Sequence, residues 1–160
     1  MPESVTKLAY RWILKQARIS EVVYLGLFLS PMDQKKLLQK FGKLHPVVYA
    51  DHMTIWYFKD GGDPNLESLP LGKSFSLKII GYAEDEKAQA VIVRPPTKFK
   101  PKAGRVPHIT LTTESGVSAQ YSNILIAQST QKSPLKGLPT ITGKLGWFDG
   151  EKARFDLLRA

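Results

Sequence analysis

The tripeptide His-x-Thr occurs twice in segments that alternate polar and apolar residues, and this repeat constrains the fold of the 160-residue chain most. The copies are His52-Met53-Thr54 and His108-Ile109-Thr110. Side chains at i and i+2 of a β-strand share a face, so each segment predicts a strand with one polar and one apolar face. If both apolar faces pack into a core, the polar faces of two neighbouring strands line one groove.

The other segments predict an α+β chain in which strands dominate. Residues 21–29 are rich in β-branched and aromatic types and predict a strand. Ser30 and Pro31 then supply a helix N-cap and a first-turn proline, and Gly42 ends the helix. The remaining pattern predicts a helix over 32–41, strands over 52–58, 75–83, 88–93 and 108–113, a helix over 118–127, and a closing hairpin over 138–147 and 153–158.

The length fits one domain, which we expect to comprise residues 21–160. Residues 1–20 predict an amphipathic helical extension, with basic side chains at three- and four-residue spacing opposite a short apolar stripe. A stripe of this length favours docking on the core over anchoring in a membrane. No stretch reaches the roughly 18 to 20 apolar residues of a membrane helix, and no secretory segment precedes the fold. We therefore expect an intracellular monomer, cytoplasmic or nuclear.

Composition narrows the chemistry that the chain can perform. It contains no cysteine, which excludes disulfides, thiolate nucleophiles and cysteine-bearing metal sites. The formal net charge of +9 favours polyanionic partners. Residues 94–105 contain five basic residues and no acid, and lead directly into the second tripeptide. This loop predicts contacts with phosphate.

The two histidines suit acid–base chemistry on a phosphodiester. One imidazole can take a proton from an attacking water while the other, as imidazolium, protonates the leaving oxygen. A single histidine in an apolar strand is usually a packed, half-buried residue, but two of the three histidines in this chain carry the same tripeptide. A metal site is disfavoured, because two histidines fall short of the usual three or four ligands. The third, His45, precedes a proline in a loop and is interpreted as structural or solvated.

These motifs resemble the 2H phosphoesterase superfamily, named for its paired His-x-Thr/Ser motifs, from about Val22 to the C-terminus. Gly81-Tyr82-Ala83, Pro107 to Leu111 and Tyr121-Ser122-Asn123 are similar to the cyclic phosphodiesterase domains of tRNA-ligase-type RNA repair proteins. The resemblance implies a bilobal, pseudo-twofold α+β fold, with antiparallel sheets flanked by helices around a central groove. It also implies that the catalytic residues are His52 and His108 and the phosphate-binding residues Thr54 and Thr110.

The resemblance implies a metal-independent phosphodiesterase that needs no cofactor and hydrolyses 2′,3′-cyclic phosphate ends of RNA or nucleotides. One alternative is a related enzyme that cleaves cyclic oligonucleotide second messengers or 2′–5′ linkages. Another is a basic RNA-binding module without catalysis. The sequence leaves open which histidine is the base.

Substrate binding is expected to need an aromatic side chain, since stacking on a base contributes about 1 to 3 kcal/mol. Candidates that could stack a base, each with core packing as the alternative, are Tyr24, Trp56 and Trp147. Trp56 continues the alternation of the first motif and is expected on its face. Candidate phosphate contacts beside the second motif, with solvation as the alternative, are Lys98, Lys100 and Arg105.

Overall fold

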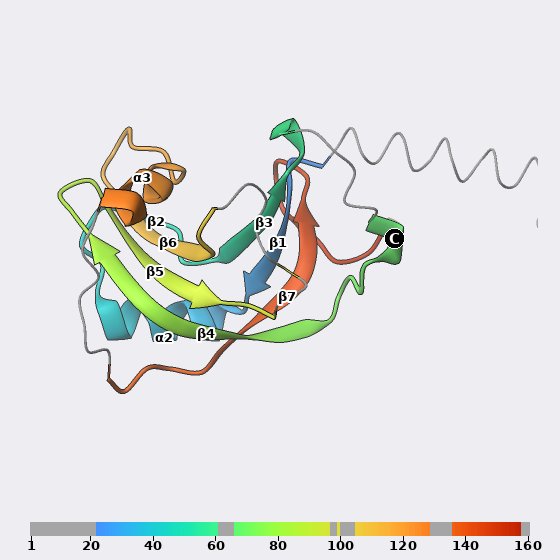
Figure 1. The fold of residues 1–160 in the computed structure, drawn as a ribbon, viewed down its shortest axis with the longest axis horizontal. Coiled ribbons are helices and arrows are strands. Elements are labelled where there is room, and N and C mark those ends of the chain that lie inside the picture. Colours follow the sequence, from blue (N-terminus) through green and yellow to red (C-terminus); the bar gives the residue numbers. More distant parts are fainter. Residues whose placement is uncertain (1–21, 61–65, 97–98, 100–104, 129–135, 158–160) are drawn as a thin grey trace, which may run out of the picture.

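The computed structural model describes residues 22–60, 66–96, 99, 105–128 and 136–157. In these residues eight strands, all paired antiparallel, form a sheet in the order β2-β6-β5-β4-β7-β1-β3, with β8 paired to β7 (Figure 1). The α+β class expected from the sequence is confirmed. The helices are α2 (Pro31–Phe41) and α3 (Tyr121–Gln128), with single 3₁₀ turns η1 (Phe58–Asp60) and η2 (Leu66–Ser68). The strands are β1 (Tyr24–Leu29), β2 (Val47–Val48), β3 (His52–Tyr57), β4 (Ser74–Glu84), β5 (Ala88–Arg94), β6 (His108–Thr113), β7 (Ile141–Phe148) and β8 (Ala153–Arg154).

The long strand β4 belongs to both halves of this sheet. Its first residues, Ser74 to Leu77, pair with β7, and its later residues, Lys78 to Glu84, pair with β5. One half is therefore β4-β7-β1-β3 and the other is β4-β5-β6-β2. The sheet curves so that β3 and β6, far apart in strand order, contact each other (Figure 1). This curvature brings the strands of the two motifs together.

A short link between β2 and β3 fixes the two motifs side by side. After β2 pairs with β6, the backbone N–H groups of Tyr49 and Ala50 donate to the carbonyls of Leu111 and Thr110, both at 2.8 Å. Ala50 has a φ of 56°, in the left-handed region that residues with a side chain rarely adopt. The chain turns there and enters β3 two residues later. The first motif thus starts directly beside the second.

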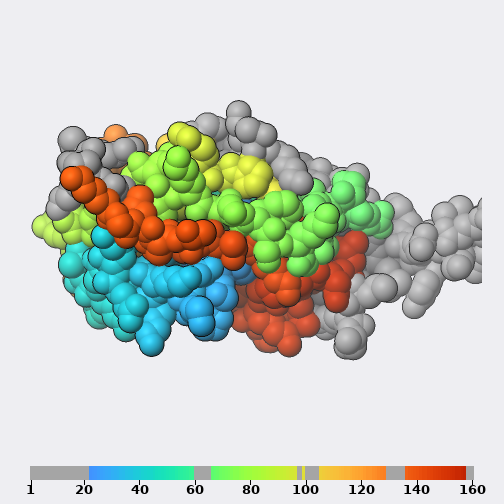
Figure 2. Space-filling view, turned by 90° about the horizontal axis from the view of Figure 1, so that it is seen from below, coloured from blue at the N-terminus to red at the C-terminus, as the bar shows by residue number. Residues whose placement is uncertain are grey.

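Helix α2 forms where its sequence signals predicted it. The side chain of Ser30 accepts a hydrogen bond from the N–H of Asp33, and Pro31 occupies the first turn. Gly42 follows the last turn with a φ of 81°, which glycine adopts without strain. Asp33 in turn accepts a hydrogen bond from the N–H of Thr142 at the start of β7. Figure 2 shows α2 in blue beside the orange segment that leads into β7.

The middle residues of both tripeptides lie in the core. Met53 and Ile109 have no exposed surface, and neither does Leu111. His52, Thr54 and His108 are partly exposed on the opposite faces of their strands. The alternation expected for these segments is therefore confirmed at the motifs themselves.

Other boundaries differ from the sequence expectation. Strand β2 was not expected, α3 begins three residues later than predicted, and β8 is only two residues long. The helical extension predicted over 1–20 lies outside the described residues. No helix in the described ranges has the length and apolar character needed to cross a membrane.

Candidate active site

A pocket lies between β3 and β6, with the start of α3 on one wall. All four polar residues of the two motifs line it, together with residues from the loop before β6 and from α3. The lining residues are His52, Thr54, Ile55, Tyr57, Arg105, Val106, His108, Thr110, Ala119, Gln120 and Asn123. The fold therefore brings together the residues that the sequence singled out from segments 56 positions apart (108 − 52).

The ring of His52 is held by its neighbour in sequence. Nδ1 of His52 donates to Oδ1 of Asp51 at 2.8 Å. Burial alone would raise the pKa of Asp51, but the hydrogen bond and the charge of His52 outweigh it, so this pKa lies below its ordinary value. The carboxylate is thus ionised and can only accept, which leaves Nε2 of His52 as the ring nitrogen available to a substrate.

Tyr24 packs against this imidazole instead of presenting a face to a base. Its ring centroid lies 4.7 Å from that of His52, with an angle of 21° between the rings. Its other neighbours include the rings of Phe148 and Tyr57, and only 9% of the residue is exposed. Burial, with a smaller effect from Asp51, raises the pKa of its hydroxyl, which stays protonated. Tyr24 therefore packs on His52 and leaves little of its ring exposed to a base.

His108 is anchored through backbone. Its Nδ1 lies 2.8 Å from the carbonyl oxygen of Val106. A carbonyl only accepts, so Nδ1 carries the hydrogen and Nε2 is free to accept a proton when the ring is neutral. Burial lowers the pKa of His108 most, the hydrogen bond to Val106 opposes this, and the smaller effects of the charges of His52 and Arg105 lower the pKa further, so that the net shift is downward. The neutral ring is therefore favoured.

The hydroxyl of Thr110 forms hydrogen bonds with Ser122 in α3 and with Ala119 just before this helix. Its Oγ1 donates to the carbonyl of Ala119 at 3.2 Å and lies 2.8 Å from Oγ of Ser122. Because Thr110 uses its hydrogen on Ala119, Ser122 is the donor to Thr110. Ser122 has no exposed surface, whereas Thr110 keeps 8% at the pocket wall.

A β-bulge at Ile55 changes which aromatic side chain faces the pocket. Leu25 and Gly26 of β1 pair with Trp56 and Thr54 of β3, so Ile55 is an extra residue in β3. Beyond it the alternation is reversed: Tyr57 lines the pocket and Trp56 packs against the core. The expectation that Trp56 shares the face of the first motif is wrong, because strict alternation requires an uninterrupted ladder.

The remaining candidate residues lie in different places. Trp147 has 1% exposed surface, donates to the carbonyl of Asp156 and does not line the pocket, so it packs in the core. Arg105 lines the pocket, and its contact with phosphate stays a prediction. Lys98 and Lys100 lie outside the described residues. His45 is buried away from the pocket between Glu114 and the carbonyl of Asp85, consistent with a structural role.

Sequence reasoning missed three residues that shape this pocket. Asp51 directly precedes the first motif, and an acid beside a histidine is a usable signal. Ser122 belongs to Tyr121-Ser122-Asn123, which only the resemblance to cyclic phosphodiesterase domains singles out. Tyr57 could not be found by alternation, because the bulge is decided by the pairing with β1. Within the described ranges, no three histidine, cysteine or acidic side chains converge on a point where they could hold a metal ion.

Comparison with solved structures shows that the fold occurs elsewhere. A crystal structure described as that of a fungal RNA kinase matches with a TM-score of 0.50 and 17% sequence identity. The match covers 85% of this chain and 43% of that one, so the chain corresponds to less than half of that protein. At this identity the likeness establishes a shared fold. No protein-family model matches the chain, and no curated protein matches it in sequence.

Proposed function

We propose that the chain is a metal-independent phosphodiesterase that hydrolyses 2′,3′-cyclic phosphates by acid–base catalysis with His52 and His108. The observation that carries this proposal is one pocket lined by both imidazoles and both motif threonines. Each imidazole has its Nδ1 fixed by an acceptor, Asp51 or the carbonyl of Val106, so each has Nε2 available. Two imidazoles in this state are the groups that general acid–base cleavage of a phosphodiester needs.

His108 is assigned as the base. Its lowered pKa favours the neutral ring, whose Nε2 can accept a proton from water. The water oxygen attacks phosphorus, and His108 takes the water proton as the new phosphorus–oxygen bond forms. The hydroxyl of Thr54 and the guanidinium of Arg105 at the pocket wall can stabilise the charge that develops on the non-bridging oxygens, and Thr110 can join them when its hydroxyl hydrogen turns from the carbonyl of Ala119 to the phosphate.

His52 is assigned as the acid. The carboxylate of Asp51 stabilises the positive charge that His52 carries as an imidazolium. Its proton passes to the ribose oxygen as the bond between that oxygen and phosphorus breaks. The product is a phosphate monoester with a free hydroxyl on the neighbouring carbon. Proton exchange with solvent then restores both rings.

RNA ends are the proposed physiological substrate class. The net charge of +9 favours a polyanion, and one structural neighbour is described as a fungal RNA kinase. The bilobal, pseudo-twofold arrangement of the 2H superfamily is part of the same proposal. It is supported by the two halves of the sheet that share β4 and each contribute one motif strand to the pocket.

A kinase activity is less well supported by this chain. Gly72-Lys73-Ser74 has the ending of a phosphate-binding loop, but Glu67 stands where that motif requires its first glycine. Ser74 also begins strand β4, whereas the motif leads into a helix whose N-terminus binds phosphate. This segment therefore lacks the loop geometry that binds a nucleoside triphosphate.

The proposal is tested with a panel of nucleoside 2′,3′-cyclic phosphates, cyclic di- and trinucleotides and 2′–5′ dinucleotides, assayed in chelator. We expect hydrolysis of the 2′,3′-cyclic phosphates, and losses of at least roughly 10²-fold in His52→Ala and His108→Ala. His45→Gln, at the histidine outside the pocket, is the matched control. Turnover that persists in either active-site variant, or that vanishes in chelator, would falsify the mechanism. Preference for the cyclic oligonucleotides would instead identify a second-messenger enzyme, and RNA binding without turnover a binding module.

A further inference from the structure

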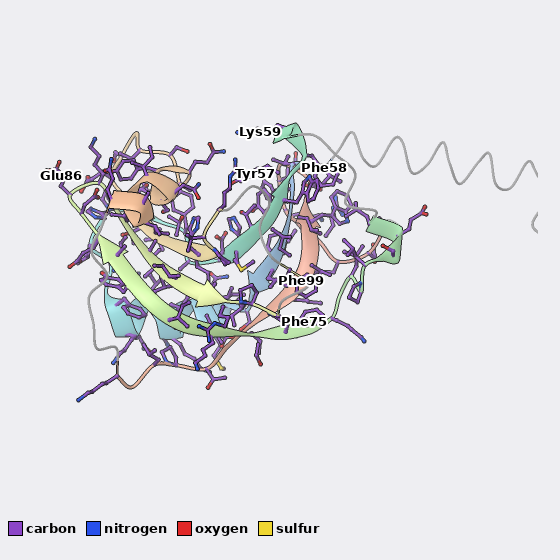
Figure 3. All side chains as sticks on the ribbon, viewed as in Figure 1. Tyr57, Phe58, Lys59, Phe75, Glu86 and Phe99 are labelled. Atoms are coloured by element: carbon purple, nitrogen blue, oxygen red, sulfur yellow. The ribbon has the colours of Figure 1, made fainter. Side chains whose placement is uncertain are left out.

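Two cations gather around one aromatic ring at the end of β3. Nζ of Lys59 lies 5.3 Å from the centroid of the Tyr57 ring, and Cζ of Arg105 lies 5.7 Å from the same centroid. Both distances are within the roughly 6 Å over which an aromatic face attracts a cation. Figure 3 labels Tyr57 and Lys59 at the end of β3 away from α2. We call Tyr57, Lys59 and Arg105 the Tyr57 cluster.

The cluster extends from the pocket outward. Tyr57 and Arg105 line the pocket, whereas Lys59 is exposed in η1 and is not part of the lining. Arg105 lies close enough to His108 for its charge to lower the pKa of that histidine. Positive charge therefore continues from the proposed reaction centre along the rim to Lys59.

This arrangement suits a second phosphate better than a nucleobase. Two cations already lie over the ring of Tyr57, so a base that stacks on this ring competes with them and favours displacement of one of them. A phosphate needs no such displacement, because its charge is attracted by both cations. In an RNA end that carries a 2′,3′-cyclic phosphate, the next phosphate is attached to the 5′ oxygen of the same nucleotide.

We propose that the Tyr57 cluster binds the phosphate on the 5′ side of the terminal nucleotide. This inference rests on the proposed hydrolysis of 2′,3′-cyclic phosphates and specifies its substrate. The preferred substrate is then an RNA end or a 5′-phosphorylated nucleotide, and a nucleoside 2′,3′-cyclic phosphate without a 5′ phosphate is a poorer one. Tyr57 acts by holding the two cations in position.

Three substrates with the same terminal base separate a phosphate contact from a base contact. They are uridine 2′,3′-cyclic phosphate, its 5′-phosphorylated form, and adenylyl-(3′→5′)-uridine 2′,3′-cyclic phosphate. We expect kcat/KM to be roughly 10-fold higher for both substrates with a 5′ phosphate, the effect of one charge-assisted contact. The preference is also expected to shrink as salt is raised, because phosphate contacts are screened.

Variants then locate the contact. Lys59→Ala and Tyr57→Leu are expected to reduce the preference towards 1, whereas Tyr57→Phe keeps the ring and the preference. Lys87→Ala is the matched control, since Nζ of Lys87 lies over a different ring, Tyr121, at 5.5 Å, and is not part of the pocket lining. Lys59 is exposed, so its substitution keeps the test valid if Tyr57→Leu does not fold.

The outcomes are distinguishable. Hydrolysis of all three substrates with equal kcat/KM would overturn the inference and leave the proposed function standing. A preference for the dinucleotide alone would also overturn it, because that result assigns the contact to the second base. If none of the three substrates is hydrolysed, the proposed function itself is overturned.

Discussion

The hydroxyl oxygens of Thr110 and Ser122 lie 2.8 Å apart, which connects the second motif to helix α3. Ser122 is fully buried, so no solvent competes for this hydrogen bond. It fixes the hydroxyl oxygen of Thr110 at the pocket wall; the hydrogen of this hydroxyl points to the carbonyl of Ala119 and turns to phosphate in the proposed mechanism. Helix α3 therefore takes part in the site without placing a charged group there.

Ser122→Ala is expected to lower kcat/KM by roughly 10-fold, because the Thr110 hydroxyl loses its donor and its fixed position. The pH dependence of the rate should stay the same, since neither histidine is altered. Steady-state kinetics across pH check both points. Ser118→Ala, at an exposed hydroxyl that accepts from the N–H of Gln120, is the control and should behave as wild type. An unchanged kcat/KM in Ser122→Ala would show that Thr110 needs no such support.

Asp51→Asn is expected to lower kcat by roughly 10- to 100-fold, less than loss of a complete acid or base. An asparagine oxygen can still accept from Nδ1 of His52, but it lacks the negative charge that stabilises the imidazolium. KM should change much less than kcat. Single-turnover measurements on a 2′,3′-cyclic phosphate distinguish the two, and a change confined to KM would contradict the role assigned to Asp51.

The pH profile should reveal the state of His108. Because the pKa of His108 is lowered, kcat/KM should fall on the acid side only below about pH 6.5, the ordinary histidine value. Arg105→Ala removes one of the charges that lower this pKa, so the acid limb is expected to move to higher pH. Lys87→Ala should leave the limb in place. An acid limb above about pH 6.5 in the wild-type enzyme would argue against His108 as the base.

Gln89→Leu is expected to destabilise the fold by about 2 to 4 kcal/mol. Gln89 has no exposed surface; its amide donates to the carbonyls of Phe41 and Gly42, and its oxygen accepts from Thr112 at 2.7 Å. A leucine leaves these groups without partners. Urea denaturation measures the change.

Thr113, which follows Thr112 in β6, has a buried hydroxyl whose removal in Thr113→Val is expected to cost no stability. Oγ1 of Thr113 is buried and has no hydrogen-bond partner among the described residues. Valine has nearly the same shape without the hydroxyl, so this variant should be as stable as wild type or more stable by up to about 1 kcal/mol. A loss of stability comparable to that of Gln89→Leu would show that the Thr113 hydroxyl does have a partner.

Local signals made much of the fold predictable. The Ser30 cap, Pro31 and Gly42 are short-range features, and α2 begins and ends where they indicated. Alternation over a few residues likewise located β3 and β6 and buried Met53 and Ile109. These features depend on the chain within a few positions, which a single sequence displays.

The sequence predictions were wrong where pairing with a distant strand decides which way a side chain faces. The bulge that moves Trp56 out of the pocket and Tyr57 into it exists only in the pairing of β3 with β1. Trp147 is buried in β7, an inner strand whose neighbours β4 and β1 come from distant parts of the chain, and nothing near it in sequence indicates this position. The contacts of Thr110 with α3 also join residues that only the folded chain brings together.

The position of β7 has a consequence for biosynthesis. Of the pairings in the described residues, those of β7 with β4 and β1 join the β1–β3 pair to the rest of the sheet. Every residue that lines the pocket precedes residue 141, so both motifs are synthesised before β7. The pairing of β2 with β6 and the link through Ala50 join the motifs without β7, whereas, in the described part of the chain, β1 and β3 are joined to β4 only through it. We therefore expect the sheet to be completed last, when β7 inserts between two strands made earlier.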